Sequence, residues 1–244
     1  MDDRHQISPV SRRFLLAACG LRALPRLLSA QPAAGRGGPP ASEVWTIDRL
    51  EGIGGYPTKV LGRPRLISTP LGKAVEFNGV EDALFVENHP LAGAELFTWE
   101  VVFRPDSGGA QEQRFFHLQE RDPETGADTG RRFLFETRLS GGNWCLDAFV
   151  HSGSASKTLI DRSRMHPLDR WYHAAMVYDG KEFRSYVNGE LQAASEVRFA
   201  PQRAGHTSIG VRINKVDYFK GAIRLARMSR RALPPSEFLK LKSP

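Results

Sequence analysis

Hydrophobic and polar residues alternate with a period of two through the middle of the chain. In residues 97–103 the odd-numbered positions are Phe, Trp, Val and Phe, and the intervening positions include Thr and Glu. The same alternation recurs in residues 115–119, 132–139 and 143–151. Successive side chains of a strand point to opposite faces, so this period indicates strands with one face on a core and the other toward solvent. The middle of the chain is therefore predicted to form half-exposed β-strands.

The clearest turn signals lie in residues 171–189, WYHAAMVYDGKEFRSYVNG. Asp179 and Gly180 separate two apolar, strand-like runs, and Asn188 and Gly189 follow the second run. Glycine tolerates the positive φ that a tight turn requires, so an Asp-Gly or Asn-Gly pair between such runs predicts a hairpin. We expect a three-stranded meander here, with the residues after Gly189 folding back as its third strand.

Shorter strand candidates and one short helix complete the pattern. The additional strand candidates are residues 44–50, 59–61, 73–77, 83–86, 207–213 and 218–226. The helix is predicted over residues 235–241, where Pro235 can open it and Ser236 can cap it. About twelve short strands separated by regular turn signals are typical of an all-β sandwich or barrel.

The first 34 residues have the order of an export signal. Arg12 and Arg13 precede an apolar run, and small residues and prolines follow it. The arrangement resembles a twin-arginine signal, and the alternatives are lipid anchoring at Cys19 or a disordered basic tail. We expect residues 1–34 to be an export signal that is removed and residues 35–43 to be a flexible linker. The protein would then be periplasmic or extracellular.

Charge and hydropathy exclude two classes of partner. The formal net charge is +7, but residues 1–34 contribute five Arg and two Asp, so it is +4 without them. The remaining basic residues are interspersed with acidic ones, which argues against nucleic-acid binding. No apolar run approaches the roughly 20 residues of a spanning helix, so we expect no transmembrane segment. Cys145 would be the only cysteine left after export and is expected to be a small buried residue.

Four motifs, in order along the chain, resemble a known domain family. They are VEFNGVEDALFV (75–86), FTWEVVFRP (97–105), WYHAAMVYDGKEFRSYVNGEL (171–191) and SIGVRINKVDYFKGAIRLARMSRRALPPSEF (208–238). Together they are similar to the laminin G-like domain of the concanavalin A-like lectin/glucanase (jelly-roll) superfamily. The resemblance covers residues 44–242. It implies an antiparallel two-sheet jelly-roll sandwich with one concave sheet. Such domains mostly bind glycans or proteins, sometimes through calcium, and related members are glycoside hydrolases and polysaccharide lyases.

The polar faces of the middle strands form the candidate ligand-binding site. If consecutive strands pair, one sheet face carries Glu100, Arg104, His117, Gln119, Glu136, Arg138, Asn143 and Asp147. Carboxylates, amides and guanidinium groups together offer the donors and acceptors that sugar hydroxyls require. By the same alternation Trp144 points into the core, whereas Phe115 shares the polar face. The competing interpretation is an ordinary solvent-exposed sheet face.

Catalysis is the alternative to simple binding. A glycosidase needs two carboxylates at a defined spacing, and Glu100, Glu136 and Asp147 could supply a pair. The E-x-D-x-x-E pattern of laminarinase-type enzymes is absent, and short segments similar to those of alginate lyases occur in the wrong order. We therefore assign no catalytic residue. A carbohydrate- or ligand-binding domain is the favoured hypothesis, with a polysaccharide-active enzyme or a protein-interaction module as alternatives.

Metal binding is a secondary hypothesis. No His/Cys cluster has the spacing of a zinc site. Asp82, Asp179 and Asn188 lie at predicted turns and could join backbone carbonyls around calcium, although such residues more commonly form the turn itself. His173, in a core-like strand, is expected to have a structural role. The sequence identifies neither the ligand nor the oligomeric state.

Overall fold

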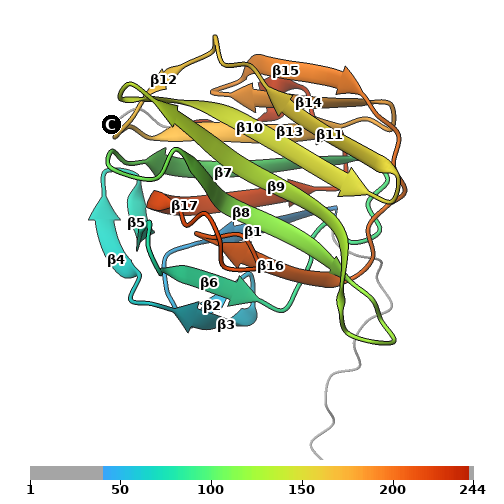
Figure 1. The fold of residues 1–244 in the computed structure, drawn as a ribbon, viewed down its shortest axis with the longest axis horizontal. Helices are drawn as coiled ribbons and strands as arrows, with labels where there is room; N and C mark the ends of the chain where they lie inside the picture. The colour runs from blue at the N-terminus through green and yellow to red at the C-terminus, as the bar shows by residue number, and fades with distance from the viewer. Residues whose placement is uncertain (1–40, 242–244) are drawn as a thin grey trace, which may run out of the picture. The chain divides into compact units, whose positions relative to one another are not determined.

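The structure, a computed structural model, describes residues 41–241 and consists of two antiparallel β-sheets (Figure 1). Sheet 1 has the strand order β15-β14-β13-β7-β17-β5-β4, with β1 also pairing with β17. Its strands are β1 (Ser42–Thr46), β4 (Arg65–Thr69), β5 (Gly72–Asn78), β7 (Phe97–Pro105), β13 (Tyr172–Tyr178), β14 (Glu182–Val187), β15 (Glu190–Glu196) and β17 (Lys220–Ser229).

Sheet 2 has the strand order β11-β10-β9-β8-β16-β6-β3-β2, with β12 also pairing with β10. Its strands are β2 (Gly52–Ile53), β3 (Tyr56–Leu61), β6 (Ala83–Val86), β8 (Glu112–Arg121), β9 (Asp128–Ser140), β10 (Asn143–Ser152), β11 (Ala155–Ile160), β12 (His166–Pro167) and β16 (Gly205–Ile209). The two sheets form a sandwich, so the predicted all-β jelly-roll architecture is confirmed.

The meander predicted from residues 171–189 is present as β13, β14 and β15. Gly180, Asn188 and Gly189 all have positive φ, of 91°, 50° and 83°. The Asn188 side chain also accepts a hydrogen bond from the backbone N–H of His173, at 2.9 Å. The turn residues therefore act as the sequence predicted, because they adopt the left-handed conformation that closes a tight hairpin.

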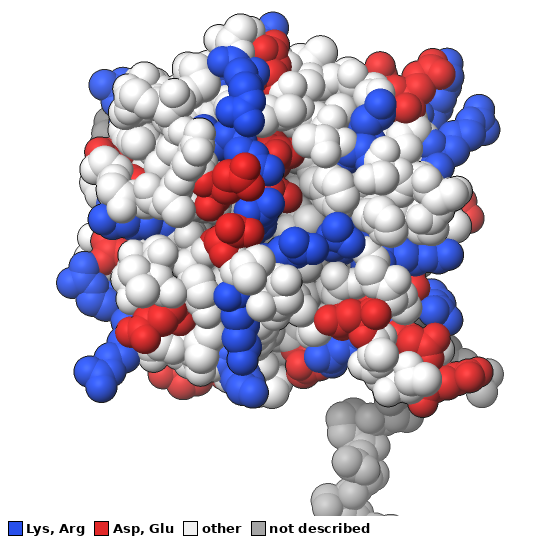
Figure 2. All heavy atoms as spheres, in the orientation of Figure 1, with Lys and Arg blue, Asp and Glu red and all other residues white. Residues whose placement is uncertain are grey.

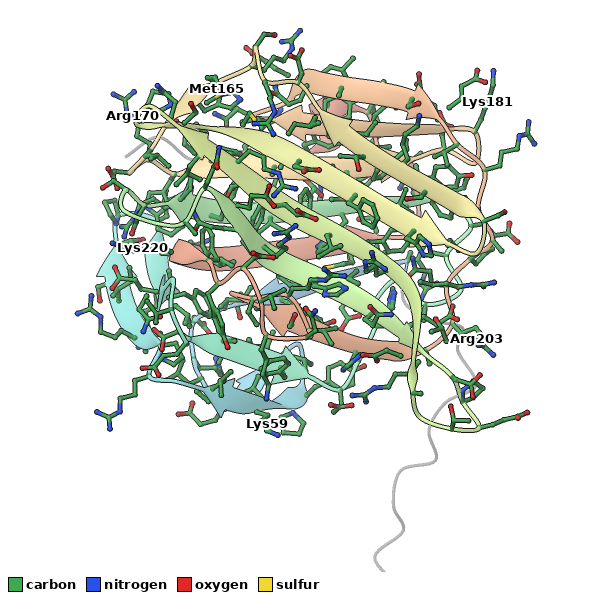
Figure 3. The ribbon with its side chains drawn as sticks, viewed as in Figure 1. Lys59, Met165, Arg170, Lys181, Arg203 and Lys220 are labelled. Carbon is green, nitrogen blue, oxygen red and sulfur yellow. The ribbon has the colours of Figure 1, made fainter. Side chains whose placement is uncertain are left out.

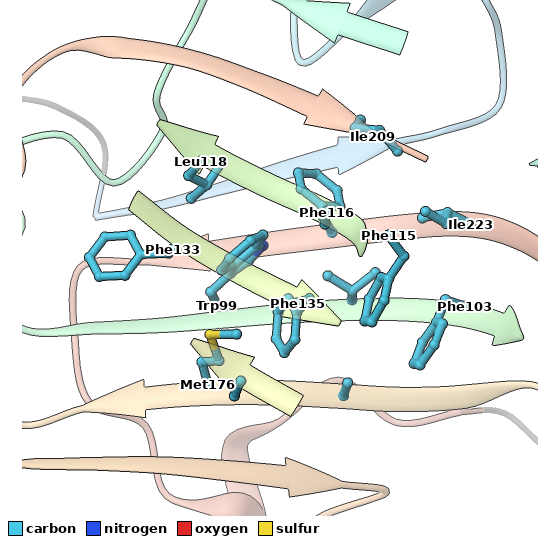
Figure 4. Packing of buried hydrophobic residues seen from close by; sticks show 14 of the residues in the cluster. Trp99, Phe103, Phe115, Phe116, Leu118, Phe133, Phe135, Met176, Ile209 and Ile223 are labelled. Atoms are coloured by element: carbon cyan, nitrogen blue, oxygen red, sulfur yellow. The ribbon is translucent and has the colours of Figure 1, made fainter. Parts of the chain in front are cut away.

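Aromatic side chains from both sheets fill the core (Figure 4). Trp99 of sheet 1 packs edge-on against Phe116 of sheet 2, with ring centroids 5.2 Å apart. Phe103 of sheet 1 stacks on Phe115 of sheet 2 at 4.2 Å. Trp144 is fully buried, as its alternation predicted. Burial of several large aromatic rings supplies the apolar area that stabilises a sandwich without cross-links.

A β-bulge in β8 overturns one prediction of the simple alternation. Phe115 was expected to share the polar face with His117, but Phe115 and Phe116 are both fully buried. The register of β8 against β9 shifts between Arg114 and Phe116, so an extra residue of β8 is inserted there. A bulge lets two successive residues point to the same side of the sheet.

The predicted helix over residues 235–241 is wrong. The chain forms only a 3₁₀ turn, η1 (Pro235–Glu237), and returns to an extended conformation at Phe238 (φ −65°, ψ 156°). Phe238 is buried against Tyr186, with ring centroids 5.2 Å apart, and the Leu239 N–H donates to Glu100. These tertiary contacts with the outer face of sheet 1 replace the hydrogen bonds that a helix would make.

Several N-terminal predictions lie outside the described residues. The export signal (1–34), Cys19 and most of the linker (35–43) fall in residues 1–40, and β1 begins at Ser42. Within residues 41–241, no helix is long and apolar enough to cross a membrane.

Candidate functional site

The eight predicted site residues lie on two different sheets. Glu100 and Arg104 belong to β7 of sheet 1, whereas the other six belong to β8, β9 and β10 of sheet 2. The chain crosses between the sheets after Pro105, so β7 and β8 do not pair. The assumption that consecutive strands pair therefore holds for β8, β9 and β10 but fails at β7. Glu100 and Arg104 are consequently not part of a common face with the rest.

Glu100 anchors the C-terminal segment to sheet 1. Its side chain is fully buried and accepts hydrogen bonds from His173 Nε2 at 2.9 Å, from Arg227 Nε at 2.5 Å and from the Leu239 N–H at 2.7 Å. Burial raises the pKa of Glu100, but the hydrogen bonds from His173, Arg227 and Leu239 outweigh it and the pKa is lowered overall. His173 has the structural role expected for it.

Arg104 is also held by its own sheet. Its Nε and Nη2 atoms donate to Asp106 at 2.6 and 2.8 Å, and Nη2 also reaches Glu76 at 3.2 Å. Its guanidinium lies 5.7 Å from the ring centroid of Trp171. Its donors are thus largely used within the outer face of sheet 1.

The outer face of sheet 2 contains a charged hollow at its centre. Antiparallel pairing places Asp147 of β10 directly opposite Glu136 of β9, and Cys145 opposite Arg138. Figure 2 shows acidic and basic side chains interleaved along the middle of this face, and Figure 3 shows polar side chains projecting from the same strands. The hollow has a volume of about 180 Å³ and is lined by Arg114, Arg132, Leu134, Glu136, Arg138, Asp147, Phe149, Thr158 and Arg212.

Two buried carboxylates and two arginines form the floor of this hollow. Arg138 Nη2 lies 2.9 Å from Glu136 Oε2 and 2.7 Å from Asp147 Oδ2. Arg114 Nε lies 2.9 Å from the same Glu136 oxygen. The side chains of Glu136 and Asp147 are only 5% and 2% exposed, so these ion pairs are shielded from water. Glu112, at the rim, contacts Arg138 Nη1 at 2.6 Å.

The environment makes both carboxylates weaker acids than usual. Burial, and then the negative charge of Asp147, raise the pKa of Glu136 to about 7, although Arg114 and Arg138 act in the opposite direction. Burial likewise raises the pKa of Asp147 despite its ion pair with Arg138. Glu136 can therefore hold or release a proton near neutral pH.

Some polar atoms at the hollow have no partner within residues 41–241. Asp147 Oδ1 and Arg132 Nε are buried and make no hydrogen bond to the described protein. Buried polar groups are normally paired, and an unpaired one costs about 1–3 kcal/mol. A ligand that supplies a donor for Asp147 and an acceptor for Arg132 would remove this cost.

The other predicted residues of sheet 2 do not line the hollow. His117 is 1% exposed, and its Nδ1 accepts the Ile213 N–H at 3.0 Å. Gln119 is buried and donates to the carbonyl of Arg131 at 3.0 Å. Asn143, at the start of β10, donates to the Gly141 carbonyl at 3.1 Å. Of the eight predicted residues, the hollow brings together Glu136, Arg138 and Asp147.

Three lining arginines were not among the predicted site residues. Arg132 is on the polar face by its alternation and could have been included. Arg114 precedes the bulge of β8. A regular alternation counted back from Phe116, which faces the core, would assign Arg114 to the core face instead of the polar face. Arg212 lies in the loop after β16, where no periodicity indicates a direction.

The residues considered for calcium act in turns. Asp82 accepts the backbone N–H groups of Arg63 and Asn78, at 2.7 and 3.0 Å. Asp179 accepts those of Lys181 and Glu182, at 3.0 and 2.8 Å. Over residues 41–241, no three His, Cys, Asp or Glu side chains are grouped as ligands of a metal ion. Both oxygens of Asp82 and Oδ1 of Asp179 are thus already used by the backbone, and Oδ2 of Asp179 accepts from Arg184 at 2.7 Å.

Comparison with known proteins gives a family match and several similar folds. The family model of the concanavalin A-like lectin/glucanases superfamily matches residues 78–238. Domain 4 of AbnA, a GH43 extracellular arabinanase from Geobacillus stearothermophilus, solved in complex with arabinotriose, has a TM-score of 0.57 and 20% identity. That match covers 80% of this chain and 94% of the other. None of the curated proteins matches the chain.

Two further solved structures are similar. The sialidase CBM40 of Ruminococcus gnavus, bound to α2,3-sialyllactose, has a TM-score of 0.51 and 16% identity over 72% of this chain and 95% of that one. The binding domain of botulinum neurotoxin serotype D has a TM-score of 0.56 and 14% identity over 80% of this chain. The match spans about half of the neurotoxin chain, 49%. At these identities the similarity shows the fold alone.

Proposed function

The chain belongs to the concanavalin A-like lectin/glucanase superfamily, and from this membership we propose that the hollow of sheet 2 binds a carbohydrate. The observation that carries the proposal is the Glu136–Arg138–Asp147 ion network at the floor of an open hollow. Burying charged groups costs desolvation free energy, so a buried ion network contributes little to stability and is better explained by a role in binding. Held rigidly by one another, they present fixed donors and acceptors to a ligand.

The chemistry of the hollow suits a sugar ring. A hydroxyl group both donates and accepts hydrogen bonds, so it could pair with Asp147 Oδ1 and with Arg132 Nε, which have no partner among residues 41–241. Leu134 and Phe149 add apolar surface for the C–H groups of the ring. A site with a few placed polar groups on an apolar base is typical of small-ligand recognition.

The similar folds and the N-terminal sequence add support. The arabinanase domain was solved with arabinotriose and the CBM40 domain with sialyllactose. We extend the proposal to export: the order of residues in 1–34 would deliver the domain to the periplasm or the outside of the cell. There it would meet a glycan or, as an alternative, an extracellular protein ligand.

Calorimetry of the full chain against a panel of neutral and acidic oligosaccharides tests the proposal. We expect a bound sugar to lose at least ten-fold in affinity in Asp147→Asn, Glu136→Ala and Arg138→Ala, because each removes a hydrogen bond to a charged group. Lys181→Ala is the matched control, because Lys181 lies at the margin of the molecule (Figure 3) and its ion pair with Glu196 is exposed.

Circular dichroism melting establishes that each variant is folded. Asp147→Asn keeps the shape of the side chain and is expected to fold, so a loss of binding in this variant is not explained by unfolding. The proposal that the hollow binds carbohydrate is wrong if the folded variants bind every sugar as tightly as the parent chain, or if no sugar binds the parent chain.

A second candidate function is cleavage of a polysaccharide. It is favoured by the pKa of Glu136, about 7, beside the ionisable Asp147, because one carboxyl held protonated next to another is the arrangement used for acid–base catalysis. Incubation with uronate and neutral polymers tests it. New reducing ends or an unsaturated product absorbance, lost in Glu136→Gln, would support catalysis, whereas binding without any product would exclude it for the polymers used.

A further inference from the structure

We propose that the carbohydrate bound in the hollow is acidic, and that Arg132 and Arg212 together bind its carboxylate or sulfate group. This inference rests on the proposed carbohydrate binding and adds the chemical class of the ligand. It follows from the distribution of charge in the hollow.

The four arginines of the hollow fall into two pairs. Arg114 and Arg138 are neutralised by the buried carboxylates Glu136 and Asp147 and, at the rim, by Glu112 and Asp217. Arg132 and Arg212 line the same hollow and have no carboxylate within ion-pair distance in the part of the chain that the structure describes. Four carboxylates therefore surround Arg114 and Arg138, whereas the positive charges of Arg132 and Arg212 are left without a carboxylate partner among the described residues.

Arg132 is held in place with donors to spare. Its Nη1 donates to the Gly130 carbonyl at 2.7 Å, and its guanidinium lies 4.9 Å from the ring centroid of Phe149. Its Nε is buried and has no acceptor within residues 41–241. A guanidinium fixed by a stacking contact and one hydrogen bond presents its remaining N–H groups in a defined direction.

Arg212 is placed by a loop that is tied to sheet 2. The Gly210 N–H donates to the Phe115 carbonyl at 2.9 Å, and the Ile213 N–H donates to His117 Nδ1 at 3.0 Å. Within the loop, the Lys215 N–H donates to the Arg212 carbonyl at 2.7 Å. The backbone that carries Arg212 is therefore fixed against β8, and a fixed donor loses less conformational entropy when it binds an anion.

The two free arginines lie close enough to repel each other. Burial, and then the positive charge of Arg212, lower the pKa of Arg132. His117 beneath them adds no positive charge, because burial and both arginines lower its pKa and its Nδ1 already accepts an N–H. Two like charges at one site are unfavourable until an anion lies between them. Such an anion would also satisfy the Nε of Arg132.

The neighbouring carboxylates favour an acidic sugar over a small inorganic anion as the ligand. A small anion could use the arginines but would leave Asp147 Oδ1 without a donor and would lie near two buried acids. A sugar with one anionic substituent can place that substituent on Arg132 and Arg212 and a hydroxyl on Asp147. The planar guanidinium fork matches a carboxylate or a sulfate in two parallel hydrogen bonds.

Paired ligands test this inference with the full chain. Calorimetry would compare uronic-acid oligosaccharides with their methyl esters and sulfated oligosaccharides with their desulfated forms, which also separates a carboxylate ligand from a sulfate ligand. We expect the acidic member of one pair to bind at least ten-fold more tightly, and this preference to weaken as salt is raised. Arg212→Gln and Arg132→Gln should each remove most of the preference.

The control and the outcomes separate this inference from the proposed function. Arg231→Gln removes the same charge from an exposed ion pair with Glu237 in the C-terminal segment and should leave the preference unchanged. Equal binding of acidic and neutral partners, abolished by Asp147→Asn but not by Arg212→Gln, would overturn the acidic ligand and keep carbohydrate binding. Absence of binding to every sugar would overturn both.

Discussion

At the scale of single residues, burial decides what a carboxylate does in this protein. Glu100 and Glu136 both project from the polar side of an alternating strand, and the sequence gives them equal weight. Glu100 is enclosed by His173, Arg227 and the backbone of Leu239, so its charge serves the fold. Glu136 lies at the floor of an open hollow, where its partners leave room for a ligand.

Loss of Glu100 is expected to destabilise the domain. Glu100→Ala would leave Arg227 and His173 without their acceptor and would release the Leu239 N–H, so we expect the free energy of unfolding to fall by about 3 kcal/mol. Urea unfolding measures the change. Arg104→Ala is the comparison, because Arg104 is 23% exposed and its ion pairs are closer to solvent, so its loss should cost less. Equal losses in the two variants would contradict the assigned role of Glu100.

The pKa of Glu136 predicts a pH-dependent stability. Its folded-state pKa of about 7 lies above its ordinary value of 4.5, so the folded protein holds a proton that the unfolded chain releases. The unfolding free energy should therefore fall as pH rises from about 4.5 to 7, by up to about 3 kcal/mol. In Glu136→Gln this contribution to the decrease in unfolding free energy with rising pH should be absent. Urea unfolding of both proteins between pH 4.5 and 8 checks it, and parallel pH curves would show that Glu136 does not titrate as described.

At the scale of elements, local sequence patterns predict the structure correctly where neighbouring strands are joined directly by a short turn. The alternation of β9 and β10 and the turn residues of the β13–β14–β15 meander agree with the structure. The pattern fails at the bulge of β8, which moves Phe115 into the core, and at the C-terminal segment, where an expected helix is only a 3₁₀ turn. In both places contacts with residues distant in the sequence outweigh the local preference.

The C-terminal segment should contribute measurably to stability. Phe238 is 4% exposed and forms a small apolar cluster with Ala175, Val177, Tyr186 and Leu233 on the outer face of sheet 1. We expect Phe238→Ala to lower the free energy of unfolding by about 3 kcal/mol, because it removes a buried ring and leaves a cavity. Thermal or urea unfolding measures it. Leu191→Ala, at a side chain that is 44% exposed, should cost little by comparison.

At the scale of the whole molecule, sheet membership determines which polar groups can act together. Glu100 and Asp147 were expected on one face, but they lie on opposite outer faces of the sandwich because the chain changes sheets between β7 and β8. Only the strands that follow one another in sheet 2 bring their polar side chains together. The loop carrying Arg212 completes the hollow from a segment 65 residues after Asp147 in the chain.

Export concerns the whole chain and can be tested on the proposed signal, residues 1–34. Fused to a reporter, this segment should direct it out of the cytoplasm, and replacing both Arg12 and Arg13 with lysine should block export if the twin-arginine machinery is used. Cell fractionation with an activity assay measures the distribution. A reporter that stays in the cytoplasm with the parent segment would show that residues 1–34 are not an export signal. Cys19→Ser tests lipid anchoring in the same assay.

The sequence by itself determined the fold class, the strands of the central region and the turn chemistry of the meander, because period-two alternation and Asp-Gly or Asn-Gly turns depend on neighbouring residues. It also predicted the pairing that sets Glu136, Arg138 and Asp147 side by side. Only the tertiary structure decided that Glu100 and Arg104 are on the other sheet and that Arg114, Arg132 and Arg212 surround the buried acids. Arg132 had a local signal in the alternation of its strand. The sheet of Glu100 and Arg104 and the positions of Arg114 and Arg212 depend on long-range strand pairing, a bulge and a loop position, and none of these leaves a local signal in the sequence.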